Sequence, residues 1–176
     1  VELDESGECL QGGGPTDLRE LVVRRGGELL VLAGVAADAA AGDAQIIATL
    51  DNGSAMAKFA QMVAAQEGDL NAARPRGEAL VMESPAAGVV ESIDAERLGY
   101  ALIELGGGRK QKTGPIDPSV GLEMLVRLGD SVEQGQPVAR MFVADRGVET
   151  AERLTREAIC ISDTGAQPEL LHERID

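Results

Sequence analysis

Residues 88–114 read GVVESIDAERLGYALIELGGGRKQKTG, and this stretch holds a strand, a helix and a glycine-rich loop in succession. The apolar residues of 88–93, preceded by Pro85, predict a strand. Asp94 is a typical N-cap residue, and apolar residues follow it at helical spacing: Leu98, Ala101, Leu102 and Leu105. The glycines 106–108 end the helix. A helical segment up to residue 70, followed by mixed strands and helices from residue 79, predicts an α+β fold.

Toward the C-terminus, further strands are expected at 79–82, 122–128, 137–144 and 158–162, with a helix at 149–158. Residues 129–138 read as a hairpin that resembles the rim of a biotinyl or lipoyl carrier. This predicts a barrel-sandwich character for the C-terminal α/β module. A carrier displays a modified lysine in a tight turn, and the three lysines lie elsewhere: Lys58, Lys110 and Lys112. The resemblance therefore concerns shape and not carrier function.

Toward the N-terminus, residues 1–70 predict a helical segment. Thr16, Asp43 and Ser54 are expected to cap three of its helices. The apolar residues of the first of these predict one buried stripe: Leu18, Leu21, Val22, Leu29 and Leu32. Residues 74–77, Arg-Pro-Arg-Gly, break both patterns. The chain is thus divided into a helical segment 1–70, a linker 71–78 and a module 79–176.

Composition excludes several classes of function. Thirty acidic residues against 16 basic ones give a net charge of −14, which repels a nucleic-acid backbone or an anionic membrane. Aromatic residues that could stack on bases are scarce, with no Trp, one Tyr and two Phe. The longest apolar run, 29–37, is shorter than the ~20 residues that span a bilayer. We expect no nucleic acid, no membrane and a cytoplasmic location.

The stretch 106–114 is the strongest candidate for a ligand-binding loop. Gly107 and Gly108 favour unusual backbone conformations, and Arg109, Lys110 and Lys112 bring three positive charges together in an acidic chain. The loop could bind phosphate or close over a ligand. The alternative is a helix C-cap followed by a solvated loop, and both interpretations remain open from the residues.

The spacing of the remaining candidate residues matches no recognisable catalytic or metal-binding motif. Cys9 and Cys160 match no disulfide or zinc pattern and are expected to be reduced, packed thiols. His172, the only histidine, has no partner in a recognisable catalytic motif and is expected to be a surface or hydrogen-bonded histidine without a catalytic role. The acidic residues near Glu5 are typical of a solvated helix face. The start at Val1, inside an apparent amphipathic element, predicts a piece of a longer protein.

Several blocks in a conserved order resemble the C-terminal portion of pyrimidine-nucleoside (thymidine) phosphorylases. The blocks are Val1–Glu5, Pro15–Glu20 with Glu28–Gly34, Asp51–Phe59, Gln61–Gln66, Ile93–Gly99, Gly106–Arg109 and Ile116–Gly121. The resemblance implies a two-lobed pentosyltransferase that cleaves thymidine or uridine with inorganic phosphate, giving the free base and (deoxy)ribose 1-phosphate. It places residues 1–70 at the end of the larger α/β lobe and residues 79–176 in the C-terminal module.

The resemblance also assigns roles within the whole enzyme. It places the catalytic groups upstream of Val1, so that none lies in this segment and the isolated segment is expected to be inactive. It implies phosphate as co-substrate, no required cofactor, a potassium ion near Glu5, and a homodimer formed through the N-terminal half. The loop containing Gly107–Lys112 would then act in domain closure. The alternative is an independent, non-catalytic structural or regulatory module of the same fold.

Overall fold

The computed structural model describes residues 2–170, and these form two compact units. Residues 2–72, with Glu169 and Leu170, make the first unit, and residues 73–168 make the second. Helices and small open antiparallel sheets are both present, which confirms the α+β class. Within the described residues no helix is long and apolar enough to cross a membrane.

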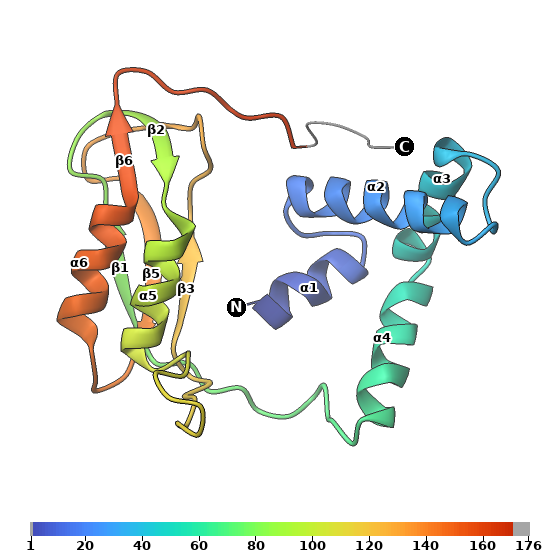
Figure 1. Ribbon diagram of the computed structural model, residues 1–176, viewed down its shortest axis with the longest axis horizontal. Coiled ribbons are helices and arrows are strands. Elements are labelled where there is room, and N and C mark those ends of the chain that lie inside the picture. The colour runs from blue at the N-terminus through green and yellow to red at the C-terminus, as the bar shows by residue number, and fades with distance from the viewer. Residues whose placement is uncertain (1, 171–176) are drawn as a thin grey trace. The chain divides into compact units, whose positions relative to one another are not determined.

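The first unit is built from helices (Figure 1), as the sequence predicts. They are α1 (Glu2–Leu10), α2 (Thr16–Leu32), α3 (Ala39–Asp51) and α4 (Ser54–Ala65). The three predicted caps were wrong. Pro15 and Gly53 occupy the cap positions of α2 and α4, without side-chain cap bonds. Asp38 caps α3 by accepting a hydrogen bond from the backbone N–H of Ala41 at 2.8 Å, because the helix begins five residues earlier than expected.

The contact between α2 and α3 is formed by glycines and not by the predicted apolar stripe. A Cβ atom on Gly42 would collide with the backbone of Gly27, so the two helices meet backbone to backbone. Leu29 and Leu32 are 64% and 82% exposed, which corrects the prediction that they share a buried face. The predicted stripe fails only toward the end of α2, since Leu18, Leu21 and Val22 are half-buried.

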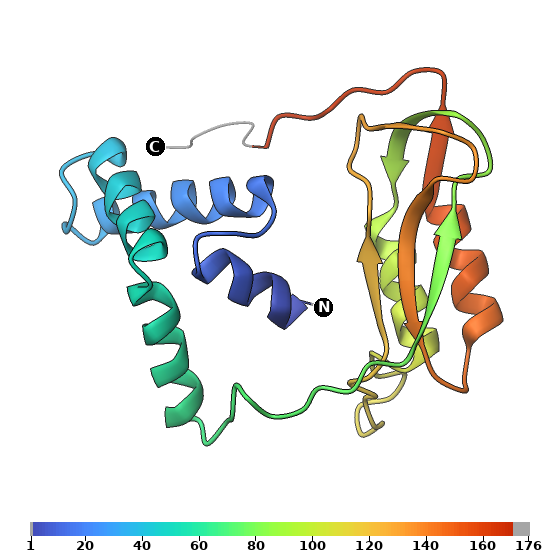
Figure 2. The same ribbon diagram turned by 180° about the vertical axis from the view of Figure 1, so that it is seen from behind.

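The second unit contains two three-stranded sheets and two helices. One sheet has the order β1 (Glu78–Glu83), β5 (Pro137–Val143), β3 (Gly121–Met124), and the other β4 (Ser131–Val132), β2 (Gly88–Ile93), β6 (Ile159–Ser162). All pairs in these sheets are antiparallel. Helices α5 (Ala95–Leu105) and α6 (Val148–Ala158) pack side by side on one side of the β1–β5–β3 sheet, as Figure 1 and the reverse view in Figure 2 show.

The hairpin expected around residues 129–138 is present in a wider form, because the flanking strands β3 and β5 pair antiparallel. β4 pairs with β2, whereas β5 pairs with β1 and β3, so this segment passes from one sheet to the other. Val132 and Val138 are both 4% exposed and belong to the same apolar cluster. The connection is wider than expected because β4, in its middle, pairs with β2 of the other sheet. The strand expected at 122–128 likewise ends at Met124.

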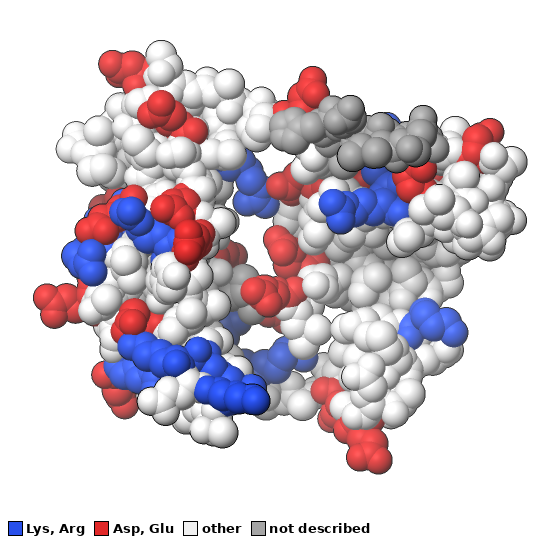
Figure 3. Space-filling model, in the orientation of Figure 1, with Lys and Arg blue, Asp and Glu red and all other residues white. Residues whose placement is uncertain are grey.

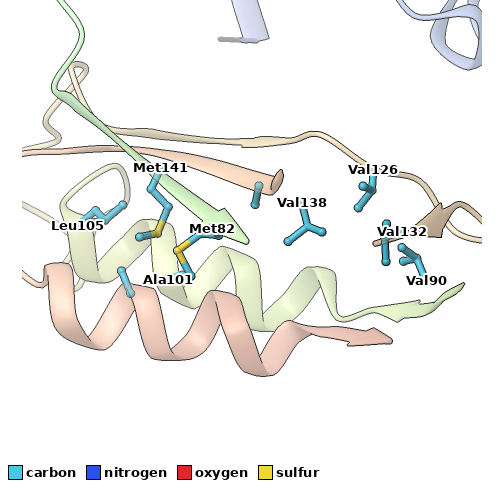
Figure 4. Close-up of a cluster of buried hydrophobic side chains, with 10 residues drawn as sticks. Met82, Val90, Ala101, Leu105, Val126, Val132, Val138 and Met141 are labelled. Atoms are coloured by element: carbon cyan, nitrogen blue, oxygen red, sulfur yellow. The ribbon is translucent and has the colours of Figure 1, made fainter. Parts of the chain in front are cut away.

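The core of the second unit lies between the helices and the strands (Figure 4). Met82 and Met141 from neighbouring strands lie beside Ala101 of α5, and each is at most 1% exposed. Thr155 of α6 is also fully buried, and its hydroxyl donates to the sulfur of Met141 at 3.4 Å. This core fixes the C-terminal end of α5, where the candidate site begins.

Candidate functional site

The candidate site is built on the end of α5. Asp94 caps the start of this helix by accepting from the backbone N–H of Arg97 at 2.9 Å, as predicted. Gly106 ends it in the left-handed region, with a φ of 109°. The N–H of Gly107 donates to the carbonyl of Leu102 at 2.9 Å, which completes the helix C-cap. The chain therefore leaves α5 along a fixed path.

The loop that begins at Gly106 is hydrogen-bonded back to Gly106 at its other end. The N–H of Asp117 donates to the carbonyl of Gly106 at 2.9 Å, which closes residues 106–117 into a loop. The carboxylate of Asp117 then accepts from the N–H and the hydroxyl of Ser119 at 2.9 and 2.6 Å. These hydrogen bonds from Ser119 lower the pKa of Asp117 below its ordinary value of 3.8, with a smaller contribution from the positive charge of Arg146.

Arg146 reaches this loop from the turn between β5 and α6. Its guanidinium lies directly over Gly106, because a Cβ atom at Gly106 would come within 3.0 to 3.2 Å of three guanidinium atoms. The next residue, Gly147, packs against the backbone carbonyl of Glu104 so closely that it has no room for a side chain. The β5–α6 turn is therefore seated on the C-terminal end of α5.

A pocket of about 440 Å³ lies where these three segments meet. Its lining comes from residues 105–106, 115–118 and 144–146. The lining includes the apolar residues Leu105 and Ile116 and the charged residues Asp117, Asp145 and Arg146. This volume is within the range of small-molecule sites. The arrangement anchors the loop on the C-terminal end of α5.

The tip of the loop carries the positive charges that the sequence singled out. Lys and Arg side chains gather over the segment that follows α5 (Figure 3). Lys110 forms an ion pair with Glu104 of α5, with Nζ and Oε2 2.5 Å apart. Arg109 and Lys112 are exposed, and neither forms an ion pair within the part of the chain that the structure describes. Two of the three cations are thus available to an anion.

The glycines of the loop serve close packing more than free rotation. A Cβ atom on Gly107 would lie 2.6 Å from a methyl group of Leu102, and one on Gly108 would lie 2.6 Å from Cγ1 of Ile103. Only Gly106 of the three has a positive φ. Residues 106–108 therefore lie flat against the last turn of α5, and the exposed tip begins at Arg109.

Four residues of this site were missed as functional candidates: Glu104, Asp117, Ser119 and Arg146. An Asp followed two residues later by Ser is typical of a turn in which the Asp side chain accepts from the backbone, so 117–119 could have been found. Arg146 lies 40 positions beyond Gly106, and no local pattern links them. The sequence did bring together Gly107, Gly108, Arg109, Lys110 and Lys112 correctly as one loop.

The other candidate residues lie away from this loop in the chain. Glu5 lies in α1, half-buried, and no group of three or more His, Cys, Asp or Glu side chains that could hold a metal occurs among residues 2–170. The residues present thus do not supply a ligand set around Glu5. Both cysteines are free thiols, but only Cys9 is buried. Cys160 is exposed, which corrects the prediction that both are packed. His172 lies outside the described residues.

Comparison with known families identifies the class of the second unit. Residues 89–162 match the family model of the pyrimidine nucleoside phosphorylase C-terminal domain. This match includes α5, the loop 106–120 and the β5–α6 turn. The resemblance of the chain to the C-terminal portion of pyrimidine-nucleoside phosphorylases is confirmed.

Individual relatives extend this similarity to nearly the whole chain. Thymidine phosphorylase of Rattus norvegicus is 37% identical over 181 residues, covering 93% of this chain and 38% of the relative. Thymidine phosphorylase of Homo sapiens is 37% identical over 179 residues, covering 93% and 37% respectively. Pyrimidine-nucleoside phosphorylase of Bacillus subtilis is 32% identical over 181 residues, covering 99% and 42%. The chain thus spans about two fifths of the length of these relatives.

Proposed function

We propose that this chain is part of a pyrimidine-nucleoside phosphorylase. The complete protein would cleave thymidine or uridine with inorganic phosphate, releasing the free base and (deoxy)ribose 1-phosphate. The observation that carries the proposal is the similarity to thymidine phosphorylases over 93% of the chain, together with the family match over residues 89–162. Such a reaction needs phosphate and nucleoside held in line and the departing base stabilised as it gains charge.

Within that enzyme, this segment would supply scaffold and a closure loop. The exposed cations Arg109 and Lys112 stand at the tip of a loop whose base is anchored on α5. A cation brought to bound phosphate only on closure stabilises the reacting state without contributing to folding. The catalytic groups themselves would lie outside this segment.

Further parts of the proposal rest on the resemblance. The protein would be a cytoplasmic homodimer, with no required cofactor and with phosphate as co-substrate. Potassium would bind near Glu5 only with oxygen ligands from outside this segment. In the complete protein, Glu5→Gln should weaken the potassium dependence of phosphorolysis. An unchanged dependence would remove Glu5 from the site.

The barrel-sandwich likeness is also part of the proposal. It is supported by the segment 129–138, which passes between the sheets, and by a core that both sheets share. An experimental structure in which the two sheets do not enclose a common core would remove this likeness.

A phosphorolysis assay tests the function directly. The 176-residue chain and the protein from the complete reading frame around it are each given thymidine or uridine with phosphate, and free base is measured. We expect turnover by the complete protein and none above buffer by the chain. Turnover by the chain alone would contradict the placement of the catalytic groups. An inactive complete protein that folds and melts cooperatively would contradict the phosphorylase proposal.

The alternative is a non-catalytic structural or regulatory module. One observation favours it: residues 73–168 form a compact unit with its own buried core. A start codon near Val1 in the gene would support this alternative. A continuous frame encoding phosphate- and base-binding loops upstream would support the phosphorylase.

A further inference from the structure

The loop between α5 and β3 has two parts that are held in different ways. Its base, residues 106–108 and 115–120, is fixed by backbone hydrogen bonds, by the carboxylate of Asp117 and by close packing under Arg146. Its tip, residues 109–113, is exposed. Among the described contacts, the tie from a tip side chain to the rest of the unit is the ion pair from Lys110 to Glu104.

We propose that this loop is a lid with a fixed base and a movable tip, and that Glu104 is the latch that holds the tip down through Lys110. The proposal goes beyond the closure loop of the proposed function, on which its purpose rests, because it names the residue that opposes movement and the part of the loop that moves. Release of Lys110 would let all three cations of the tip turn toward an anion.

The strength of the latch suits reversible release. The side chains of Lys110 and Glu104 are 52% and 32% exposed, so solvent screens the pair. Pairs of this kind shift an equilibrium by about 1.4- to 5-fold. The base differs, because breaking it would free the Asp117 N–H, the Asp117 carboxylate and the Arg146 contact together. The tip should therefore move while the base stays in place.

Trypsin provides a direct measure, because the tip contains cleavage sites after Arg109, Lys110 and Lys112. The rate of cleavage after Lys112 is compared in the 176-residue chain, Glu104→Gln, Lys110→Gln and the double variant. Glu133→Gln, in the turn between β4 and β5, makes the same change of charge and serves as the matched control. Synthetic peptides covering 104–118, carrying the same changes, report any effect on trypsin itself.

We expect each single variant to be cleaved about 1.4- to 5-fold faster after Lys112 than the parent. The double variant should match the singles, because both remove the same interaction. Glu133→Gln and the peptides should show no change. Unchanged cleavage in either single variant, or effects that multiply in the double variant, would overturn the latch.

Hydrogen exchange on the same variants tests the fixed base. The amide of Asp117 should keep the protection of the parent in Glu104→Gln. Loss of that protection would show that the whole loop opens, and would overturn the division into base and tip. Trypsin cleavage and hydrogen exchange do not measure phosphorolysis. Failure of the latch and failure of the proposed function therefore remain distinguishable.

Discussion

The guanidinium of Arg146 lies over the α-carbon of Gly106, and a Cβ atom there would come within 3.0 Å of its Nη2. The two residues are 40 positions apart, in different turns, yet together they form one wall of the pocket. Gly106 serves two purposes at this point. It gives α5 its left-handed C-cap, and it leaves room for the arginine.

Gly106→Ala should lower the free energy of unfolding by about 1 to 2 kcal/mol, the cost of placing an L side chain in the left-handed region. Gly99→Ala is the matched control. Gly99 lies inside α5 with nothing within 4 Å of a Cβ position, so alanine there should raise stability by about 0.4 to 1 kcal/mol. Urea unfolding of both variants measures the difference. Changes of the same sign would contradict this account.

The pKa of Asp117 should lie below 3.8, since hydrogen bonds from Ser119 favour its charged form. A group with a lowered pKa contributes stability above its unfolded value and loses it as the pH falls through the folded value. The charged Asp117 carboxylate should therefore stabilise the loop base at neutral pH, and this stabilisation should be lost below about pH 3.8. NMR titration of the carboxyl carbon measures this. Ser119→Ala should raise the pKa more than Arg146→Gln does, and the reverse order would show that charge dominates.

Met141→Ala should destabilise the second unit by about 2 to 5 kcal/mol, because Met141 is fully buried and its removal leaves a cavity. Met62→Ala is the control, since Met62 is 48% exposed on α4 and should change stability by less than about 0.5 kcal/mol. Thermal melting of the two variants tests this pair. A small effect of Met141→Ala would mean that the core is loosely packed.

Arg109→Ala in the complete protein should lower kcat/KM about 10- to 150-fold, if the arginine contacts phosphate only on closure. Its melting temperature should not change, because Arg109 forms no ion pair within the described part of the chain. Lys58→Ala removes an exposed cation from α4 and should leave both values unchanged. If Arg109→Ala keeps kcat/KM within about twofold of the parent, the loop is a solvated cap.

The sequence by itself determined the elements whose signals are local. Asp94 and Gly106 mark the two ends of α5 because a cap and a left-handed residue act on backbone groups within one turn. The basic loop was found for the same reason, since its glycines and cations are contiguous. Where two nearby residues could each cap the same helix, the prediction was wrong. The sequence pattern favours Asp43 as the cap of α3, but Asp38 caps it.

Only the tertiary structure decided which distant residues meet. Pairing of β4 with β2 carries residues 131–132 to the second sheet, although the strands that flank this segment, β3 and β5, pair with each other. The position of the Arg146 guanidinium over Gly106 depends in turn on the packing of α6 against α5. Such contacts carry no periodic signal, because their energy comes from surfaces that become neighbours only once the sheets and helices have assembled.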